Sequence, residues 1–302
     1  MHIPDGFLAA PVWAGLDAAA VPAVGYMVRR AQQGFAETRA PLLGVMGAFV
    51  FAAQMINFPV GVGTSGHLVG GALLAYTLGP AAASVVMTAI LAIQALVFQD
   101  GGILALGANV LNMAVVGVWA AYLPFRLWGG GRGRKWALFT GAMLSVLASA
   151  LLAIAELVVS GVKLPFPVLV VSVVLFLVSA ALEGAITVVV MEALETVQPD
   201  FVHRPAAGRP YAASALAITA VLLAAVGILF ASTHPDGLMS LAGAAGIAGR
   251  ARPLVSSPLA DYELRFFSGP WPRKAAAGIA GLLLIYAVCA MVGRWVSRSR
   301  SA

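Results

Sequence analysis

Charged residues are scarce in this sequence: Asp, Glu, Lys and Arg together make up 10% of its 302 residues. Soluble globular domains carry about 25% charged residues, so this chain cannot cover itself with the polar shell that water requires. It is instead 61% hydrophobic, with a mean hydropathy of +0.95. Lipid requires no polar shell, and the composition therefore predicts an integral membrane protein surrounded by membrane lipid.

Cysteine is nearly absent, because Cys289 is the single one in the chain. One cysteine excludes an intramolecular disulfide bond and any metal cluster built from several thiolates. Its apolar neighbours indicate a packing role. The net charge of +6 does not indicate a nucleic-acid partner, since the basic residues cluster in short segments between apolar runs, as in membrane proteins.

Several catalytic motifs are also missing. The sequence contains no GxxxxGK[ST], no HExxH and no GxSxG. Without a P-loop the chain cannot hydrolyse ATP by itself. We therefore expect no enzymatic activity and no catalytic cofactor. A membrane zinc hydrolase is a remote alternative, because no general base accompanies the histidines and zinc prefers tetrahedral sites.

What the sequence has in abundance is apolar runs of helical length. They lie at about 11–28, 41–56, 66–79, 81–98, 103–124, 136–160, 165–195, 211–231 and 275–296. The third run is short and rich in glycine, and the seventh is long enough to project beyond the lipid. We predict an all-α, polytopic bundle with a seven-helix body and a two-helix C-terminal hairpin.

The division between these two parts falls in a polar stretch, Thr196–Pro210, which is rich in proline and charge as a linker should be. We predict one domain over residues 1–200 and a second module over 201–302. A long loop, 232–273, separates the two helices of the module. A loop of this length without its own periodicity is usually functional or mobile.

The basic residues also predict an orientation. With the N-terminus outside, most of the 18 Lys and Arg residues fall in cytoplasmic segments, as the positive-inside rule requires. The C-terminus is then cytoplasmic and loop 232–273 is extracytoplasmic. The chain start lacks the basic region and apolar core of a cleavable signal peptide, so we expect Met1 to remain.

The first two residues carry the most specific chemistry. A bulky His2 after Met1 disfavours removal of the methionine and leaves a free amine. Such a chain can bind one ion through the Met1 amine, the deprotonated His2 amide and the His2 Nδ1 atom, which close a five-membered and a six-membered ring. Three nearly coplanar nitrogens suit square-planar Ni(II) or Cu(II).

A fourth ligand is expected from His67, which lies in the glycine-rich stretch Gly61–Gly71. Glycines permit irregular backbone at membrane depth where it lines a cavity or is buried in protein. An imidazole there is unfavourable without a partner. With the N-terminus outside, His67 lies on the same side as Met1, so the four nitrogens can meet.

Structural roles remain open for each of these residues. His2 can be an ordinary surface histidine, and His67 can be hydrogen-bonded for packing. The Met1 sulfur can replace its amine as a ligand, which would favour a softer ion. His203 in the linker and His234 in the long loop are interpreted as solvated.

Three stretches of the sequence resemble one family. Met1–Gly6, Gly63–Gly71 and Phe98–Met113 are similar to segments of the CbiM/NikM family, the substrate-capture (S) components of energy-coupling-factor transporters for cobalt and nickel. The resemblance covers about residues 1–200 and implies a membrane-embedded metal-binding domain.

The C-terminal part adds a second resemblance. His234–Leu238 and Ser257–Tyr262 look like the NikN-type small partner of that family, fused here to the main body. The family's PDGLE motif ends in Met239 in place of Glu, so no role of that Glu carries over.

The resemblance implies a ligand set, partners and a location. Met1, His2 and the imidazole of His67 would hold the metal. A weaker implication is that Asp5, Asn57 and Ser65 hydrogen-bond the ligands. The partners would be a transmembrane coupling (T) subunit and two ATP-binding cassette ATPase subunits, in the inner (plasma) membrane of a bacterium.

Alternatives remain open for the transported ion and for the class of membrane protein. Four planar nitrogens with an ionised amide favour Ni(II), as does the NikN-like tail, whereas a cobalt S component for cobalamin synthesis is the main alternative. A stand-alone divalent metal permease and a membrane metal sensor are the other classes.

Overall fold

The structure is a computed structural model that describes residues 1–34, 40–61, 63–198 and 211–298. Most of the predicted linker, including His203, and the proposed boundary at residue 200 lie outside these ranges. The division of the chain into 1–200 and 201–302 therefore stays a prediction.

Every predicted apolar run contains a helix, which confirms the helical membrane fold, although the run 66–79 begins in a strand and becomes helical only at Gly71. The helices that these runs form are α1 (Ala10–Gly34), α2 (Ala40–Gln54), α3 (Gly71–Leu78), α4 (Pro80–Ile93), α5 (Leu106–Asn109), α6 (Val118–Trp128), α7 (Arg134–Val159), α8 (Phe166–Val197), α9 (Tyr211–Ala225) and α11 (Pro270–Arg298). Two π-helical segments continue α4 and join α5 to α6, at Gln94–Phe98 and Val110–Gly117. Within the described residues, 7 helices are long and apolar enough to cross a membrane.

Small residues bring the C-terminal helix close to the body. Added Cβ atoms on Gly44 and Gly47 of α2 would lie 2.8 Å from Tyr286 and from the Cys289 sulfur of α11. Close backbone approach of this kind is how helices associate in lipid. Cys289 is buried at this contact, which agrees with the predicted packing role.

A short β-hairpin is a feature that the sequence did not reveal. Strand β1 (Asn57–Gly61) pairs antiparallel with β2 (Thr64–His67), with Asn57 opposite His67. Gly66 is required here, because a Cβ on it would lie 2.9 Å from the Ser179 hydroxyl of α8. The glycine-rich segment thus forms an ordered hairpin against α8.

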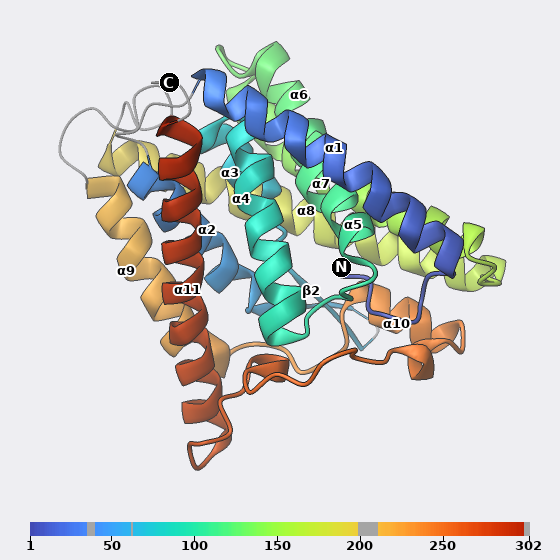
Figure 1. The fold of residues 1–302 in the computed structure, drawn as a ribbon. Helices are drawn as coiled ribbons and strands as arrows, with labels where there is room; N and C mark the ends of the chain where they lie inside the picture. Colours follow the sequence, from blue (N-terminus) through green and yellow to red (C-terminus); the bar gives the residue numbers. More distant parts are fainter. Residues whose placement is uncertain (35–39, 62, 199–210, 299–302) are drawn as a thin grey trace.

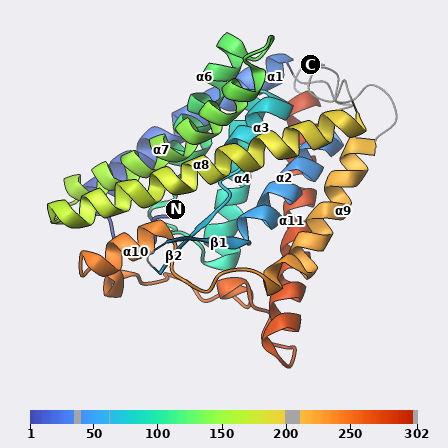
Figure 2. The ribbon, with the colours of Figure 1, turned by 180° about the vertical axis from the view of Figure 1, so that it is seen from behind.

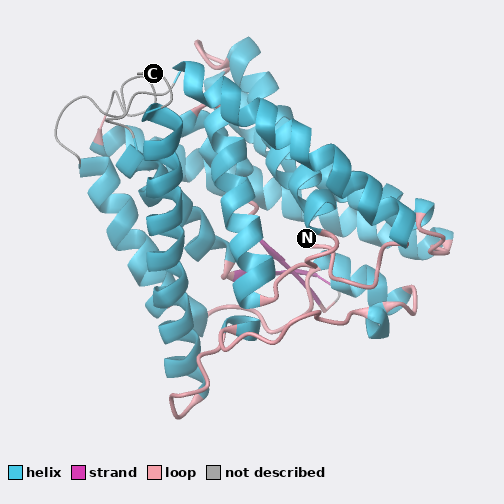
Figure 3. Cartoon of the chain, viewed as in Figure 1, coloured by secondary structure: helices cyan, strands magenta, loops and turns pink. Residues whose placement is uncertain are grey.

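The long loop is folded as well. It contains the short helix α10 (Gly237–Ala244), and the last helix begins at Pro270 instead of about residue 275. Figure 1 shows that this loop, the hairpin and the N-terminus lie together, while the C-terminal end of α11 lies at the opposite end of the bundle. Figure 2 shows α9 and α11 beside α2, and Figure 3 shows the strands and most of the long loops gathered at one end.

Candidate metal centre

The residues before α1 fold back into the protein and fix the chain start. The backbone N–H of Ile3 donates to Asn109 Oδ1 at 2.8 Å, and Asn109 Nδ2 donates to the Ile3 carbonyl at 3.0 Å. The side chains of Ile3 and Phe7 are fully buried in a small apolar cluster. Chain termini are usually frayed, so this double hydrogen bond and burial give the first residues an unusually defined position.

Asp5 anchors the same segment. Its carboxylate accepts hydrogen bonds from the backbone N–H groups of Ile103 and Leu104, at 3.0 and 2.8 Å. Gly102 is needed beside it, since a Cβ there would lie 2.4 Å from Asp5 Oδ1. The structure therefore places Asp5 on the 102–104 backbone, where it holds the N-terminal loop.

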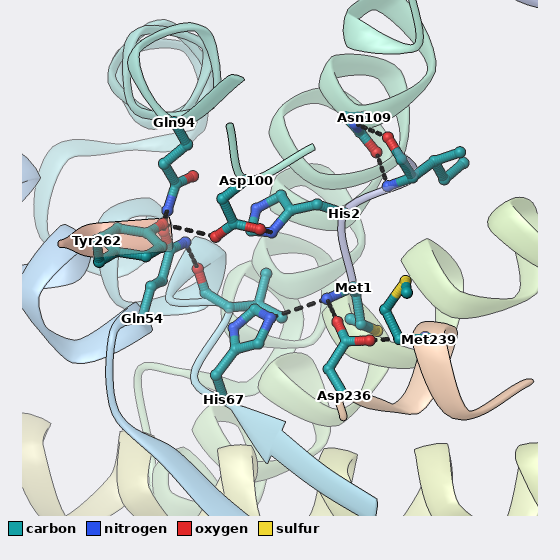
Figure 4. A network of polar contacts seen from close by, with 12 residues as sticks. Met1, His2, Gln54, His67, Gln94, Asp100, Asn109, Asp236, Met239 and Tyr262 are labelled. Carbon is teal, nitrogen blue, oxygen red and sulfur yellow. Dashed lines mark hydrogen bonds and ion pairs between the residues drawn. The ribbon is translucent and has the colours of Figure 1, made fainter. Parts of the chain in front are cut away.

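The Met1 amine lies between two acceptors. It is 2.8 Å from His67 Nε2 and 2.6 Å from Asp236 Oδ2 (Figure 4). The Met1 side chain packs against both apolar clusters of the protein. The structure thus brings the amine, not only the residue, to the predicted histidine.

His67 is oriented for ligation through Nε2. Its Nδ1 atom lies 3.0 Å from the carbonyl oxygen of Leu68, which can only accept, so Nδ1 carries the hydrogen and Nε2 the lone pair. Burial, the N-terminal amine and His2 lower the pKa of His67 to about 4. The ring is therefore neutral at pH 7, which is the form that binds metals.

The spacing of these two nitrogens fits a shared ion. Metal–imidazole bonds are about 2.0 Å long, so two nitrogens at right angles around one ion are roughly 2.8 Å apart. The amine and Nε2 are 2.8 Å apart already. A metal could replace the bridging hydrogen without separating the two groups.

His2 approaches the same point from the other side. Its ring is nearly parallel to that of His67, with centroids 5.5 Å apart and planes inclined by 5°. Its Nδ1 atom lies 3.0 Å from Asp100 Oδ1, and its buried Nε2 has no hydrogen-bond partner among the residues described. Ligation through Nδ1 therefore requires His2 to exchange Asp100 for the ion.

Asp100 connects this histidine to a polar chain. Its other oxygen accepts from the Tyr262 hydroxyl at 2.6 Å. Gln94 Nε2 donates to that hydroxyl at 3.3 Å and to Gln54 Oε1 at 2.7 Å. Burial raises the pKa of the Asp100 carboxyl, but His2 and Tyr262 outweigh this effect and lower the pKa below its ordinary value. The carboxylate is thus ionised and accepts at both oxygens.

The loop after His67 is held from behind by Glu183 of α8. Its two carboxylate oxygens accept from the backbone N–H groups of Val69 and Gly70, at 2.6 and 2.8 Å. Gln54 Nε2 donates to the Val69 carbonyl at 2.7 Å. Gly70 takes a φ of 75°, which glycine adopts without strain. These contacts fix the backbone that carries His67.

Asn57 and Ser65, the other predicted ligand partners, lie on the hairpin. Asn57 pairs with His67 across the two strands, and its carbonyl accepts from Ser232 N–H at 2.7 Å. The Ser65 hydroxyl donates to the His234 carbonyl at 2.7 Å. Both residues therefore connect the hairpin to the C-terminal module, and within the described ranges neither side chain hydrogen-bonds a predicted ligand nitrogen.

An open cavity of about 700 Å³ gives access to this region. Its polar lining includes His67, Asp100, His234, Asp236 and Asp261. The His234 ring is exposed, which agrees with its interpretation as solvated, and it lies 3.1 Å from the Ser232 hydroxyl. An ion in this space would face the carboxylates of Asp100, Asp236 and Asp261 and the ring of His67.

Side chains alone do not make a metal site here. In the part of the chain that the structure describes, no group of three or more His, Cys, Asp or Glu side chains converges on one point. The nitrogens available for an ion are the Met1 amine, the His2 amide and imidazole, and His67 Nε2. A site at this position therefore depends on main-chain nitrogen.

Four residues at the centre were not identified from the sequence: Asp100, Glu183, Asp236 and Tyr262. Three of them lie in stretches that resemble the family, in Phe98–Met113 or in the C-terminal motifs, and this was the available signal. For Glu183 the only signal was that it is a carboxyl group in an apolar helix, where ionisable residues usually have a specific partner.

Comparisons with known proteins cover nearly the whole chain. Residues 2–201 match the sequence model of the CbiM family, described as "Cobalt uptake substrate-specific transmembrane region". Residues 212–298 match the PDGLE domain. A putative fused nickel transport protein NikMN of Archaeoglobus fulgidus is 34% identical over 298 residues, which are 95% of this chain and 96% of the relative.

Other relatives carry nickel and cobalt names. The fused nickel transport protein NikMN of Rhodobacter capsulatus is 32% identical, over 97% of this chain and 94% of its own. The cobalt transport protein CbiM of Acetoanaerobium sticklandii is 35% identical over 49% of this chain and 61% of its own. A crystal structure of a truncated transition metal transporter superposes with a TM-score of 0.58 at 34% identity, covering 65% of this chain and 99% of the other.

Proposed function

Since the chain belongs to the CbiM family of cobalt uptake substrate-specific transmembrane proteins, we propose that it captures Ni(II) at the candidate metal centre for import into the cell. It is a multi-pass membrane protein with a C-terminal PDGLE domain. The observation that carries the proposal is the 2.8 Å approach of the Met1 amine to His67 Nε2.

The proposed ligands are four nitrogens in one plane. They are the Met1 amine, the His2 amide after loss of its hydrogen, His2 Nδ1 and His67 Nε2. Nickel takes such planar nitrogen sets readily. The near-parallel rings of His2 and His67 and the anchoring of Ile3 on Asn109 support this arrangement.

The choice of nickel over cobalt rests on geometry and on full-length relatives. Two relatives that match nearly the entire chain are named as fused nickel transport proteins. The second candidate is Co(II), favoured by a relative named as a cobalt transport protein. Calorimetric titration of the same protein with each ion separates the two: tighter binding of Co(II) would assign it to cobalt uptake, and with it to cobalamin synthesis.

Energy for import would come from other chains. In this proposal a transmembrane coupling subunit and two ATPase subunits use ATP to reorient the loaded protein within the bacterial plasma membrane, so that the metal passes inward, and the N-terminus and the metal centre face outward when the ion binds. Nickel uptake into vesicles should therefore require all three partner chains and ATP. Uptake without them would favour a stand-alone permease, and tight binding without any uptake, even with the partners supplied, would favour a metal sensor.

A further inference from the structure

The C-terminal module touches the N-terminal chelate at two separate points. Asp236 Oδ2 accepts from the Met1 amine at 2.6 Å. The Tyr262 hydroxyl donates at 2.6 Å to Asp100, whose other oxygen lies 3.0 Å from His2 Nδ1. Figure 4 shows Asp236 and Tyr262 on opposite sides of the first two residues. The module thus reaches both of the outer nitrogens of the proposed chelate.

Asp236 is held rigidly in this position. It caps helix α10: its Oδ1 accepts from the backbone N–H of Met239 at 2.8 Å, which leaves Oδ2 for the amine. It also forms a β-bridge with Ser65, whose N–H donates to the Pro235 carbonyl at 2.9 Å. Since Ser65 precedes His67 by two residues, one backbone contact sets the distance from Asp236 to the histidine.

The capping geometry also shows which contact depends on the residue at position 239. Met239 occupies the third position of α10, where a Glu would complete a capping box with the capping residue. Met239 still donates its backbone N–H to Asp236. Without this Glu, α10 lacks the second hydrogen bond of a capping box, while the Asp236 carboxylate still accepts from Met1.

Tyr262 is positioned by strain and stacking. Asp261 and Tyr262 both take positive φ angles, 56° and 58°, which side-chain-bearing residues adopt only when their surroundings enforce it. The Tyr262 ring stacks on Phe98 with centroids 4.8 Å apart, and Gln94 donates to its hydroxyl. Its O–H is thereby directed at Asp100.

We infer that Asp236 and Tyr262, both from segment 232–262, form a clamp on the first two residues: Asp236 holds the Met1 amine in its ligating position, and Tyr262 holds Asp100, the partner that His2 Nδ1 leaves when it binds the ion. Asp236 fixes the amine, and a bound amine keeps N–H groups that can still donate to it. Tyr262 donates to Asp100 and so stabilises this carboxylate after His2 Nδ1 has left it for the ion, which lowers its competition for the ring. This inference deepens the proposed function and rests on it for its metal-binding consequence, because outer partners of metal ligands orient them and set affinity.

The test compares three substitutions in the full-length protein in lipid nanodiscs, with Ni(II) alone as the probe. Asp236→Asn removes the charge but keeps a side chain that caps helices as well as Asp. Tyr262→Phe removes only the hydroxyl. Asp261→Asn is the matched control, since it makes the same charge change at an exposed side chain lining the same cavity, and Asn adopts the positive φ of this position as readily as Asp.

We expect Asp236→Asn to weaken Ni(II) binding by about 10- to 100-fold and Tyr262→Phe by about 10-fold, as measured for other outer partners of metal ligands. Asp261→Asn should stay within about twofold of the unaltered protein. Asp236→Glu, which restores the charge, should recover part of the affinity. Equal affinity of Asp236→Asn and Asp261→Asn would overturn the clamp.

A second readout needs no metal. The clamp predicts that an amine-reactive ester modifies the Met1 amine several times faster in Asp236→Asn than in the unaltered protein, as followed by mass spectrometry of the N-terminal peptide. Unchanged modification rates would refute the clamp even if nickel binds. Faster modification in a protein that never binds nickel would instead uphold the clamp and reject the proposed function.

Discussion

Replacing His67 with alanine separates the metal-binding role of this ring from its structural role. In the folded protein the ring donates one hydrogen bond to the Leu68 carbonyl and accepts one from the Met1 amine. A typical hydrogen bond contributes about 1 kcal/mol to stability, and the amine retains its contact with Asp236. We therefore expect His67→Ala to lower the free energy of unfolding by only about 1–2 kcal/mol.

The effect on metal affinity should be far larger. Outer partners of metal ligands are worth about 10- to 100-fold in affinity, so a direct ligand should be worth more than about 100-fold, or roughly 2.7 kcal/mol. The assay is calorimetric titration with Ni(II) beside thermal unfolding of the same nanodisc sample. His234→Ala is the control, because this exposed ring lines the same cavity and contacts the Ser232 hydroxyl. Binding by His67→Ala as tight as that of His234→Ala would remove His67 from the site.

Two further substitutions test the surroundings of the site. Glu183→Gln leaves an amide N–H₂ facing one of the Val69 and Gly70 N–H groups. The substitution should therefore lower the unfolding free energy by about 1–3 kcal/mol and weaken Ni(II) binding, because the loop that carries His67 is displaced. Tight Ni(II) binding by the destabilised protein would show that Glu183 serves stability alone. Ser65→Ala removes a hydroxyl whose hydrogen bond goes to the His234 carbonyl, so nickel affinity should change by less than about twofold, whereas a loss of about 10-fold or more would make Ser65 a ligand partner after all.

The helices could be predicted from the sequence because apolar runs of about 20 residues have few alternatives in lipid. The hairpin could not, because its strands contain the run Gly-Val-Gly-Thr-Ser-Gly and lack the alternation that identifies strands. Helix α10 was missed for a related reason: at 8 residues it is shorter than the windows that reveal helical periodicity. Both elements are stabilised by contacts with residues that are distant in the sequence.

The site was accessible to sequence reasoning only where its chemistry is local. The Met1–His2 chelate depends on adjacent residues, so ring sizes alone suggest it. Asp236 lies 235 residues from the amine it contacts, and no periodicity relates such positions. Asp5 shows the converse: its contact with the ligands, which the resemblance implies, stays a prediction, while the structure gives its carboxylate to the 103–104 backbone, a contact that no local pattern indicates.

The most direct test of the central claim is the visible absorption and magnetism of the nickel-loaded protein, measured with the Met1 amine free and after its acetylation. Four planar nitrogens predict one yellow, diamagnetic Ni(II) per chain in the first sample, and loss of that signal when acetylation removes the amine as a ligand. A paramagnetic, six-coordinate spectrum, or one that acetylation leaves unchanged, would contradict ligation by the chain's own N-terminus.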